Sequence, residues 1–170
     1  RRVLFRSEYI KAMDFDTFYE MAEPYIDRAV PGELALERRR QIANMVKTRI
    51  EVFPDIPAMI DFFGELPPYE KALYVNKKWK VTQEKALEVL EEMLPVFEHA
   101  SDYSNDALYE LIRDYAAGKG AKAGFVIWPL RIALSGKAVT PAGATEIMEV
   151  LGKTESLRRL RAGIEKLREQ

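Results

Sequence analysis

The chain has 170 residues, enough for one domain or for two small domains packed end to end, and we expect two. Charged residues make up 31% of it and nearly cancel to a net charge of −1, which excludes a uniformly basic surface that attracts nucleic acid non-specifically. The absence of cysteine excludes disulfides, a thiol nucleophile and a cysteine zinc site, and the single histidine, His99, excludes a two-histidine metal motif.

Hydropathy and the first residues bear on where the protein resides. No apolar run approaches the roughly 20 residues that cross a bilayer, and residues 1–7 lack the apolar centre of a secretory signal. Residues 1–7 also fit no pattern continuous with the helical spacing that begins at residue 8, so we interpret them as a junction. We therefore expect a cytoplasmic protein with no membrane partner, and the lack of cysteine agrees with a reducing compartment.

Apolar residues at helical spacing dominate the first half of the chain and predict an all-α protein. Asp14 is the expected N-cap of the second helix, and Pro24 is its expected end. Pro57 suits the first position of a short helix that ends at Gly64. The helices predicted here cover residues 8–13, 15–23, 32–53 (as one or two helices) and 57–63.

A loosely patterned, basic stretch over residues 69–80 divides the chain. We place the boundary inside it and expect a first helical subdomain over residues 8–76 and a second over residues 77–170. The sequence thus predicts two packed all-α subdomains, with neither an internal repeat nor a low-complexity segment.

Helix ends are marked more clearly in the second half of the chain. Thr82 and Ser104 are predicted N-caps; Gly118 with Gly120 is the predicted stop of one helix and Gly136 that of the next. Pro129 removes one backbone hydrogen bond inside its helix and is expected to kink it. The helices predicted here cover residues 83–97, 105–115, 123–134, 141–151 and 155–167.

The last two predicted helices are separated by a glycine. Thr140 is interpreted as an N-cap, Pro141 as the first helical residue and Gly152 as a left-handed C-cap. Thr154 then caps the final helix. One face of that helix is apolar and the other is basic, and we interpret the basic face as solvated surface formed by Arg158, Arg159, Arg161, Lys166 and Arg168.

No catalytic cluster stands out. The carboxylates lie among lysines and arginines, a pattern typical of solvated helix faces. Residues 118–124, G-K-G-A-K-A-G, fit neither the Walker spacing nor the dinucleotide fingerprint and follow a helix rather than a strand. We interpret them as a turn between helices that carries two lysines; a phosphate contact through this turn, with Lys122 beside the next helix, is the alternative.

Three further residues have both a structural and a functional interpretation. His99 lies near a helix end, where the helix dipole favours a cation, and is interpreted as structural. Trp128 is expected to pack in the core. Trp79, flanked by Lys78 and Lys80, is either a packing residue or an aromatic surface for unpaired bases.

One ordered set of motifs near the end of the chain is specific. Residues 129–136 read P-L-R-I-A-L-S-G and are followed by Thr140-Pro141 and by Leu151-Gly152-Lys153. This order resembles the end of the anticodon-binding region of bacterial glutamyl-tRNA synthetases, which are class I aminoacyl-tRNA synthetases. Residues 8–11 and 46–50 resemble two further helices of that family, although Glu51-Val52 replaces the usual T-L, and the similarity runs from about residue 8 to the C-terminus.

The resemblance implies a fold and a role. The family has a catalytic half followed by two all-α anticodon-binding subdomains, called the α-helix cage, and this chain resembles the latter alone. It contains neither the H-x-G-H motif nor the K-M-S-K-S motif of the catalytic half. The resemblance therefore implies recognition of the anticodon of tRNA(Glu), and in some members tRNA(Gln), without catalysis. ATP and Mg would belong to the catalytic half of a parent glutamate–tRNA ligase. This chain itself is expected to need no cofactor, and DNA is not an expected partner.

Individual residues inherit roles from the same resemblance. Arg131 is expected to approach the anticodon, where its planar fork addresses a base edge or a phosphate; an ion pair that braces the helix is the alternative. Arg49 matches an arginine through which some members discriminate the third anticodon base. Gly143 stands where some relatives hold a larger apolar residue against a base. The expected RNA-binding residues are Lys47, Arg49, Lys122, Arg131, Thr140, Pro141 and Gly143.

Two other functions are compatible with the sequence. A helical domain that kept this fold and binds protein instead would show an exposed apolar patch and no salt-dependent RNA affinity. A small helical enzyme would need a pocket lined by converging polar groups.

Overall fold

The structure, a computed structural model, describes the backbone of residues 2–170 and the side chains from Ser7 onward. Over these residues every regular element is a helix, and the one strand-like feature is an antiparallel bridge between Asn76 and Val81. The predicted all-α class is therefore confirmed. The interpretation of residues 1–7 as a junction falls almost entirely outside the described side chains.

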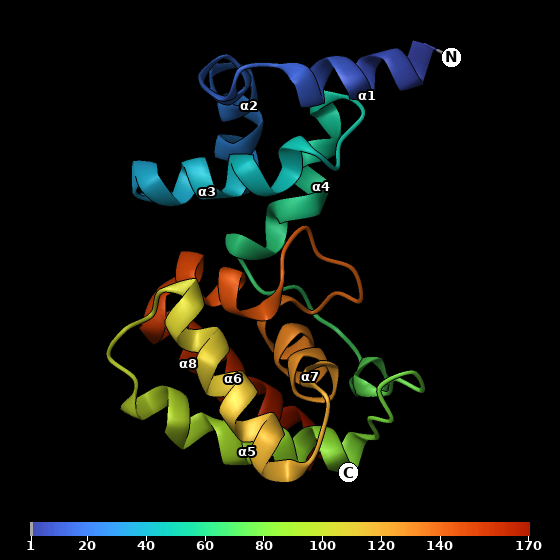
Figure 1. Cartoon of the computed structure of the whole chain (residues 1–170), viewed down its shortest axis with the longest axis vertical. Helices are drawn as coiled ribbons and strands as arrows, with labels where there is room; N and C mark the ends of the chain where they lie inside the picture. Colours follow the sequence, from blue (N-terminus) through green and yellow to red (C-terminus); the bar gives the residue numbers. More distant parts are fainter. Residues whose placement is uncertain (1) are drawn as a thin grey trace. The chain divides into compact units, whose positions relative to one another are not determined.

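The chain divides into two compact units (Figure 1). The first unit consists of Arg1–Glu65 with Thr140–Ala142, and the second consists of Leu66–Val139 with Gly143–Gln170. This division lies earlier in the chain than the expected boundary between residues 76 and 77. The reason is that η3 (Lys71–Tyr74), in the basic stretch, packs against two helices of the second unit.

The first unit is organised around its second helix. Its elements are α1 (Arg2–Ala12), α2 (Phe15–Ala29), α3 (Leu36–Lys47), η1 (Phe53–Asp55), α4 (Ile56–Ile60) and η2 (Asp61–Phe63). α2 packs against both α3 and α4. The buried side chains of these three helices recur at helical spacing, which buries one stripe of each helix, and they include Phe18, Ala22, Ile26, Ile42, Ala43, Val46, Ile56 and Ile60.

Two helices of the first unit extend beyond the predicted limits. α1 begins at Arg2 rather than at residue 8. α2 continues through Pro24, where the sequence predicted its end. Pro24 is exposed, whereas Ala22 and Ile26 on either side of it are buried, so continued burial of the apolar stripe outweighs the one hydrogen bond that proline removes.

The second unit contains four long helices. Its elements are η3, α5 (Gln83–His99), α6 (Asn105–Lys119), α7 (Ala123–Ser135) and α8 (Ala144–Arg168). α7 contacts η3 and all three other long helices, so it is buried on most sides. Three consecutive residues near its end, Ile132, Ala133 and Leu134, are fully buried, as expected for a helix that is apolar all round.

Most of the predicted helix caps are confirmed. Asp14, Thr82 and Ser104 each accept a hydrogen bond from a backbone N–H three residues later, at 3.3, 3.1 and 3.4 Å. α6 continues through Gly118, and Gly120 and Gly136 end α6 and α7 in the left-handed conformation, with φ of 64° and 67°. Caps depend on local geometry, and for that reason the sequence alone identified them.

α8 is interrupted where a break was predicted, but in a different geometry. Gly152 has φ of 81° and ψ of 171°, an extended conformation open essentially to glycine only, and not the left-handed helical cap that was expected. Gly163, further along α8, is buried, and a Cβ there would lie 2.7 Å from the Tyr74 hydroxyl oxygen and 3.0 Å from the Ala133 Cβ. The absence of a side chain at Gly163 therefore allows α8 to approach α7 and η3 closely.

Arg159 does not belong to the solvated basic face that the sequence predicted, because it is fully buried. Its Nη1 donates to the backbone oxygen of Leu134 at 2.7 Å, and its Nε donates to the Glu155 carboxylate at 2.7 Å. Leu134 lies in the last turn of α7, where carbonyl groups lack a partner within the helix. The guanidinium thus caps α7 from α8, and the prediction failed because helical periodicity does not reveal a carbonyl that needs a donor.

Glu155 is the counter-ion of this arrangement. Hydrogen bonds from Arg158, at 2.6 and 2.8 Å, and from Arg159 lower the pKa of Glu155 to about 2. Because the folded-state pKa lies below the unfolded value, the carboxylate stabilises the fold above the unfolded pKa, and this stabilisation is lost as the pH falls toward 2.

We expect Glu155→Gln to lower the free energy of unfolding at neutral pH, with the difference from the parent chain shrinking steadily as the pH falls from about 5 to about 2. Urea unfolding at a series of pH values measures this difference. A difference that stays constant with pH would contradict the assigned role of the carboxylate charge.

We expect Arg159→Ala to lower the free energy of unfolding by about 3 kcal/mol, because it leaves a cavity and an unpaired Leu134 carbonyl. Arg159→Met fills most of that volume and should cost less. An exposed arginine of α8 outside this cluster supplies the control: Arg161 pairs with Glu98 at 2.7 Å, and Arg161→Ala should change stability by less than about 1 kcal/mol. Equal effects of Arg161→Ala and Arg159→Ala in urea unfolding would contradict the buried cap.

Candidate nucleic-acid interface

Arg131, the central residue of the predicted site, is half-buried on α7. The Cζ of its guanidinium lies 5.1 Å from the centroid of the Trp128 ring, a cation–π contact between residues three apart on one helix face. Burial lowers the pKa of Arg131, but an arginine remains charged at neutral pH. A charged, planar donor is thus held against an indole.

Trp128 is itself fixed by a hydrogen bond. Its Nε1–H donates to the backbone oxygen of Tyr74 at 3.1 Å, and the Tyr74 hydroxyl shares a hydrogen bond of 2.7 Å with that of Tyr69. Tyr74 is fully buried, and burial raises its pKa, so its hydroxyl stays protonated. The indole is therefore a packed, half-buried support for Arg131, close to the core role expected for it.

The end of α7 is held by Ser135 and Gly136. The buried Ser135 hydroxyl donates to the Arg131 carbonyl at 2.7 Å and accepts the backbone N–H of Lys137 at 3.1 Å. Gly136 turns the chain in the left-handed conformation, and a Cβ there would lie 3.1 Å from the Pro67 carbonyl oxygen. The S-G pair of the motif thus sets where the loop after α7 begins.

The helix-capping role predicted for Thr140 and Pro141 is wrong. α8 begins at Ala144, and its N-cap is Gly143, whose N–H is accepted by Glu146 at 3.1 Å. The Thr140 hydroxyl donates instead to the Ala142 carbonyl at 2.6 Å, and Pro141 is buried in the turn. The chain therefore makes a compact turn before α8, because the carboxylate three residues into the helix serves as the cap that Thr140 was expected to provide.

In the first unit, the two predicted basic residues differ in their surroundings. The Lys47 ammonium donates to the backbone oxygen of Lys11 at 2.6 Å and lies 5.9 Å from the Phe18 ring centroid, so it connects the end of α3 to the end of α1. Arg49 follows α3 in a turn and is exposed. Within residues 2–170, no hydrogen bond or ion pair holds the Arg49 guanidinium, which leaves it available to a ligand.

The remaining candidates lie in the second unit. Lys122 is the exposed N-cap residue of α7. Trp79 is partly buried against the first turn of α7, since a Cβ on Gly124 would lie 2.4 Å from the Trp79 ring. His99 is the exposed last residue of α5, where the helix dipole favours a cation.

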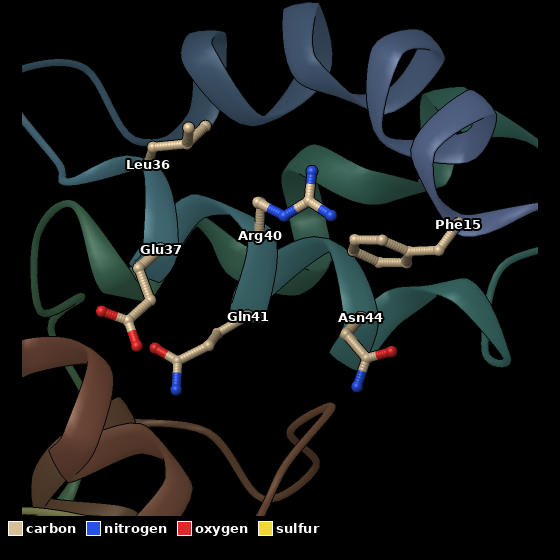
Figure 2. A pocket seen from close by; sticks show the side chains of 6 residues that line it. All are labelled: Phe15, Leu36, Glu37, Arg40, Gln41 and Asn44. Atoms are coloured by element: carbon tan, nitrogen blue, oxygen red, sulfur yellow. The ribbon is translucent and has the colours of Figure 1, made fainter.

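Sequence reasoning missed a hollow along α3, which has a volume of about 490 Å³. Figure 2 shows Glu37, Gln41 and Asn44 extending from one side of α3, while Arg40 reaches toward the Phe15 ring. The Arg40 Cζ lies 4.9 Å from the Phe15 centroid, and its Nη2 bonds Asp16 at 2.8 Å. The polar residues that line this hollow recur every three to four positions along α3, and that spacing was visible in the sequence. Charged stretches of this kind were interpreted there only as solvated helix faces.

The predicted residues are shared between the two units. Lys47, Arg49, Thr140 and Pro141 belong to the first unit, and Lys122, Arg131 and Gly143 belong to the second. Among the residues that the structure describes, no group of three His, Cys, Asp or Glu side chains is placed to hold a metal ion. In the same part of the chain, no helix combines the length and apolarity needed to span a membrane.

Comparisons with known proteins point in one direction. Residues 17–164 match the family described as an anticodon binding domain. The chain is 49% identical over 160 residues to a glutamate–tRNA ligase of Lachnoclostridium phytofermentans, covering 94% of this chain and 32% of that protein. It is 43% identical over 160 residues to a glutamate–tRNA ligase of Clostridium acetobutylicum, covering 94% and 33%. The chain thus spans about a third of the length of these curated relatives.

Solved structures share the fold. A crystal structure of a glutamate tRNA ligase from Elizabethkingia meningosepticum, in complex with its amino acid, superposes with a TM-score of 0.82 at 24% sequence identity. The match covers 98% of this chain and 32% of that chain. At this identity the likeness concerns the fold alone.

Proposed function

This chain belongs to the anticodon-binding domain family, and we propose that it holds the anticodon of tRNA(Glu) as part of a glutamate–tRNA ligase. The observation that carries the proposal is the half-buried Arg131 guanidinium held against Trp128 within the P-L-R motif. Since the chain spans about a third of its relatives, ligation of glutamate to tRNA belongs to the rest of the parent protein, where ATP and Mg would bind. The expected place of action is the cytoplasm.

Unpaired anticodon bases require both edge recognition and stacking, and Arg131 can supply both. Its fork of N–H donors matches the acceptor pair of a base edge or of a phosphate. Its contact with Trp128 restricts the guanidinium to few orientations, so less conformational entropy is lost when a base is bound. Partial burial also strengthens each hydrogen bond that the guanidinium makes to RNA.

The other residues divide into two roles in this proposal. Thr140 and Pro141 form a compact turn suited to contact with a base, and Gly143 follows it without a side chain. Lys47, Arg49 and Lys122 are cationic and hold phosphates or, for Arg49, a base edge. Lys47 already bonds Lys11, so we assign it an electrostatic role only.

The family match supports RNA recognition over the alternative of a helical protein-interaction domain. It equally supports a recognition module over a small helical enzyme.

We expect Arg131→Ala to abolish the preference of the chain for tRNA(Glu) over the same RNA with a changed anticodon. The loss should be about 1–3 kcal/mol of binding free energy for the native anticodon and little for the changed one. Fluorescence anisotropy titrations with both RNAs at two salt concentrations measure this. Arg131→Lys should retain the salt-dependent affinity and lose the preference, because an ammonium cannot make the bidentate contact.

Arg113→Ala is the matched control, since Arg113 is an exposed arginine of the second unit that pairs with Glu110 at 3.4 Å. It should leave both affinities unchanged. The proposal fails if the parent chain, shown to be folded, binds both RNAs equally.

For Arg49 we propose a role in distinguishing tRNA(Glu) from tRNA(Gln). We expect Arg49→Gln to change the ratio of the two dissociation constants by at least about threefold while stability is unaffected, because the side chain is exposed. Competition binding between the two tRNAs gives the ratio directly. A parallel decrease in both affinities would assign Arg49 to phosphate contact instead.

A further inference from the structure

A second basic site lies away from Arg131, around the turn that follows η3. A cavity of about 500 Å³ in the second unit is lined by Lys78, Trp79, Lys80, Lys85, Gly120, Ala121, Lys122 and Phe125. Four of these residues are lysines and none is acidic. The four lysines come from three separate stretches of the chain, and all four are exposed.

Within the part of the chain that the structure describes, these lysines lack the carboxylate partners that several other cations of the second unit have. Lys119, which directly precedes Gly120 of the cavity, pairs with Glu88 at 3.1 Å and Glu92 at 2.8 Å, and Arg161 pairs with Glu98 at 2.7 Å. Over the described residues, no ion pair neutralises the four lysines of the cavity. Their charges repel one another when the cavity is empty, and a polyanion would relieve this repulsion.

The turn that carries two of the lysines is held firmly. Asn76 and Val81 exchange two backbone hydrogen bonds of 2.9 Å, and the Asn76 side chain accepts the Trp79 backbone N–H at 3.0 Å. Val81 is buried. The Trp79 ring lies against the backbone of Gly124, and the Lys78 ammonium lies 5.0 Å from its centroid. The cationic groups are therefore positioned on a preformed scaffold.

Lys80 is the most informative residue of this turn. It has φ of 58° and is the one non-glycine residue with positive φ in the described part of the chain. A lysine in the left-handed conformation is strained, and glycine would adopt it without a steric penalty. A lysine thus occupies a position where the backbone conformation favours glycine, and binding of an anionic ligand by its ammonium group would explain this choice.

We propose that this cavity binds the sugar-phosphate backbone of RNA at a nucleotide outside the anticodon, independently of base identity; the inference rests on the proposed function. The four lysines supply charge for phosphate oxygens, and the partly exposed aromatic surfaces of Trp79 and Phe125 supply a contact for a ribose or base. The chemistry of lysines with aromatic residues fits a nucleic acid better than a phosphorylated peptide, which offers no base to contact.

The decisive variant is Lys80→Gly, because it removes the charge and relieves the strain together. We expect its thermal midpoint to equal or exceed that of the parent chain. Its affinity should fall between about three- and tenfold for tRNA(Glu) and equally for the RNA with the changed anticodon, with the slope of log K against log [salt] reduced by about 1. Lys77→Gln is the matched control, since Lys77 is exposed in the same turn and outside the cavity.

The outcomes separate the two proposals. If Lys80→Gly and Lys77→Gln reduce the affinity for RNA equally, or if neither reduces it, the cavity is not a phosphate site and this inference is overturned. In either case the proposed function is decided separately, by whether the parent chain prefers the native anticodon. If Lys80→Gly weakens both RNAs and the parent chain shows no anticodon preference, the cavity stands and the proposed function fails. Absence of all RNA binding overturns both.

A charge-preserving variant provides a second test. Gly124→Ala would place a Cβ 2.4 Å from the Trp79 ring and so displace the turn that carries Lys78 and Lys80. We expect it to weaken both RNAs equally, as Lys80→Gly does, although no lysine is lost. Unchanged affinity would show that the position of the turn is irrelevant and would overturn the inference.

Discussion

The second unit depends on one buried cation. The Arg159 guanidinium donates hydrogen bonds to the Leu134 carbonyl in the last turn of α7 and to the Glu155 carboxylate of its own helix. Among the described residues, Arg159 is the one charged side chain that is fully buried. Few side chains of α7 are polar and none of its residues is more than partly exposed, because α7 packs against η3 and the three other long helices of the second unit. The directional bonds of Arg159 therefore specify the depth and rotation at which α7 meets α8, which apolar packing alone would leave loosely defined.

This constraint matters because α7 carries Arg131. Under the proposed function, Arg131 reads a base, which requires a guanidinium whose position varies little, and α7 is held at several points along its length. Gly124 lies beneath the Trp79 ring, Trp128 is bonded to η3, and Leu134 is bonded to Arg159. The same helix thus connects the cavity at its start with Arg131 near its end, so that both proposed RNA contacts share one rigid element.

The sequence predicted what local geometry determines. The all-α class and the caps at Asp14, Thr82, Ser104, Gly120 and Gly136 were correct, since each depends on neighbouring residues only. The failures at Pro24 and Arg159 have tertiary causes, the burial of an apolar stripe and a distant carbonyl. The failure at Thr140 has a local cause, because the Glu146 carboxylate bonds the N–H of Gly143 at the start of α8. For the candidate site, the motif predicted Arg131, which stays a prediction, whereas the indole beside Arg131 and the grouping of lysines around Trp79 could be found only from three-dimensional proximity.

A series of contacts connects Gly163 on α8 with Arg131, which lies in the P-L-R motif of α7. Because Gly163 has no side chain, the Tyr74 hydroxyl can lie against it. The Tyr74 backbone oxygen accepts a hydrogen bond from the Trp128 indole, and the Arg131 guanidinium lies over that indole. A Cβ added at Gly163 would lie 2.7 Å from the Tyr74 hydroxyl oxygen, too close for the present packing, so the Tyr74 side chain or α8 would have to shift at the first of these contacts. Under the proposed function, the position at which Arg131 meets an anticodon base thus depends partly on Gly163, a residue to which no RNA contact is assigned.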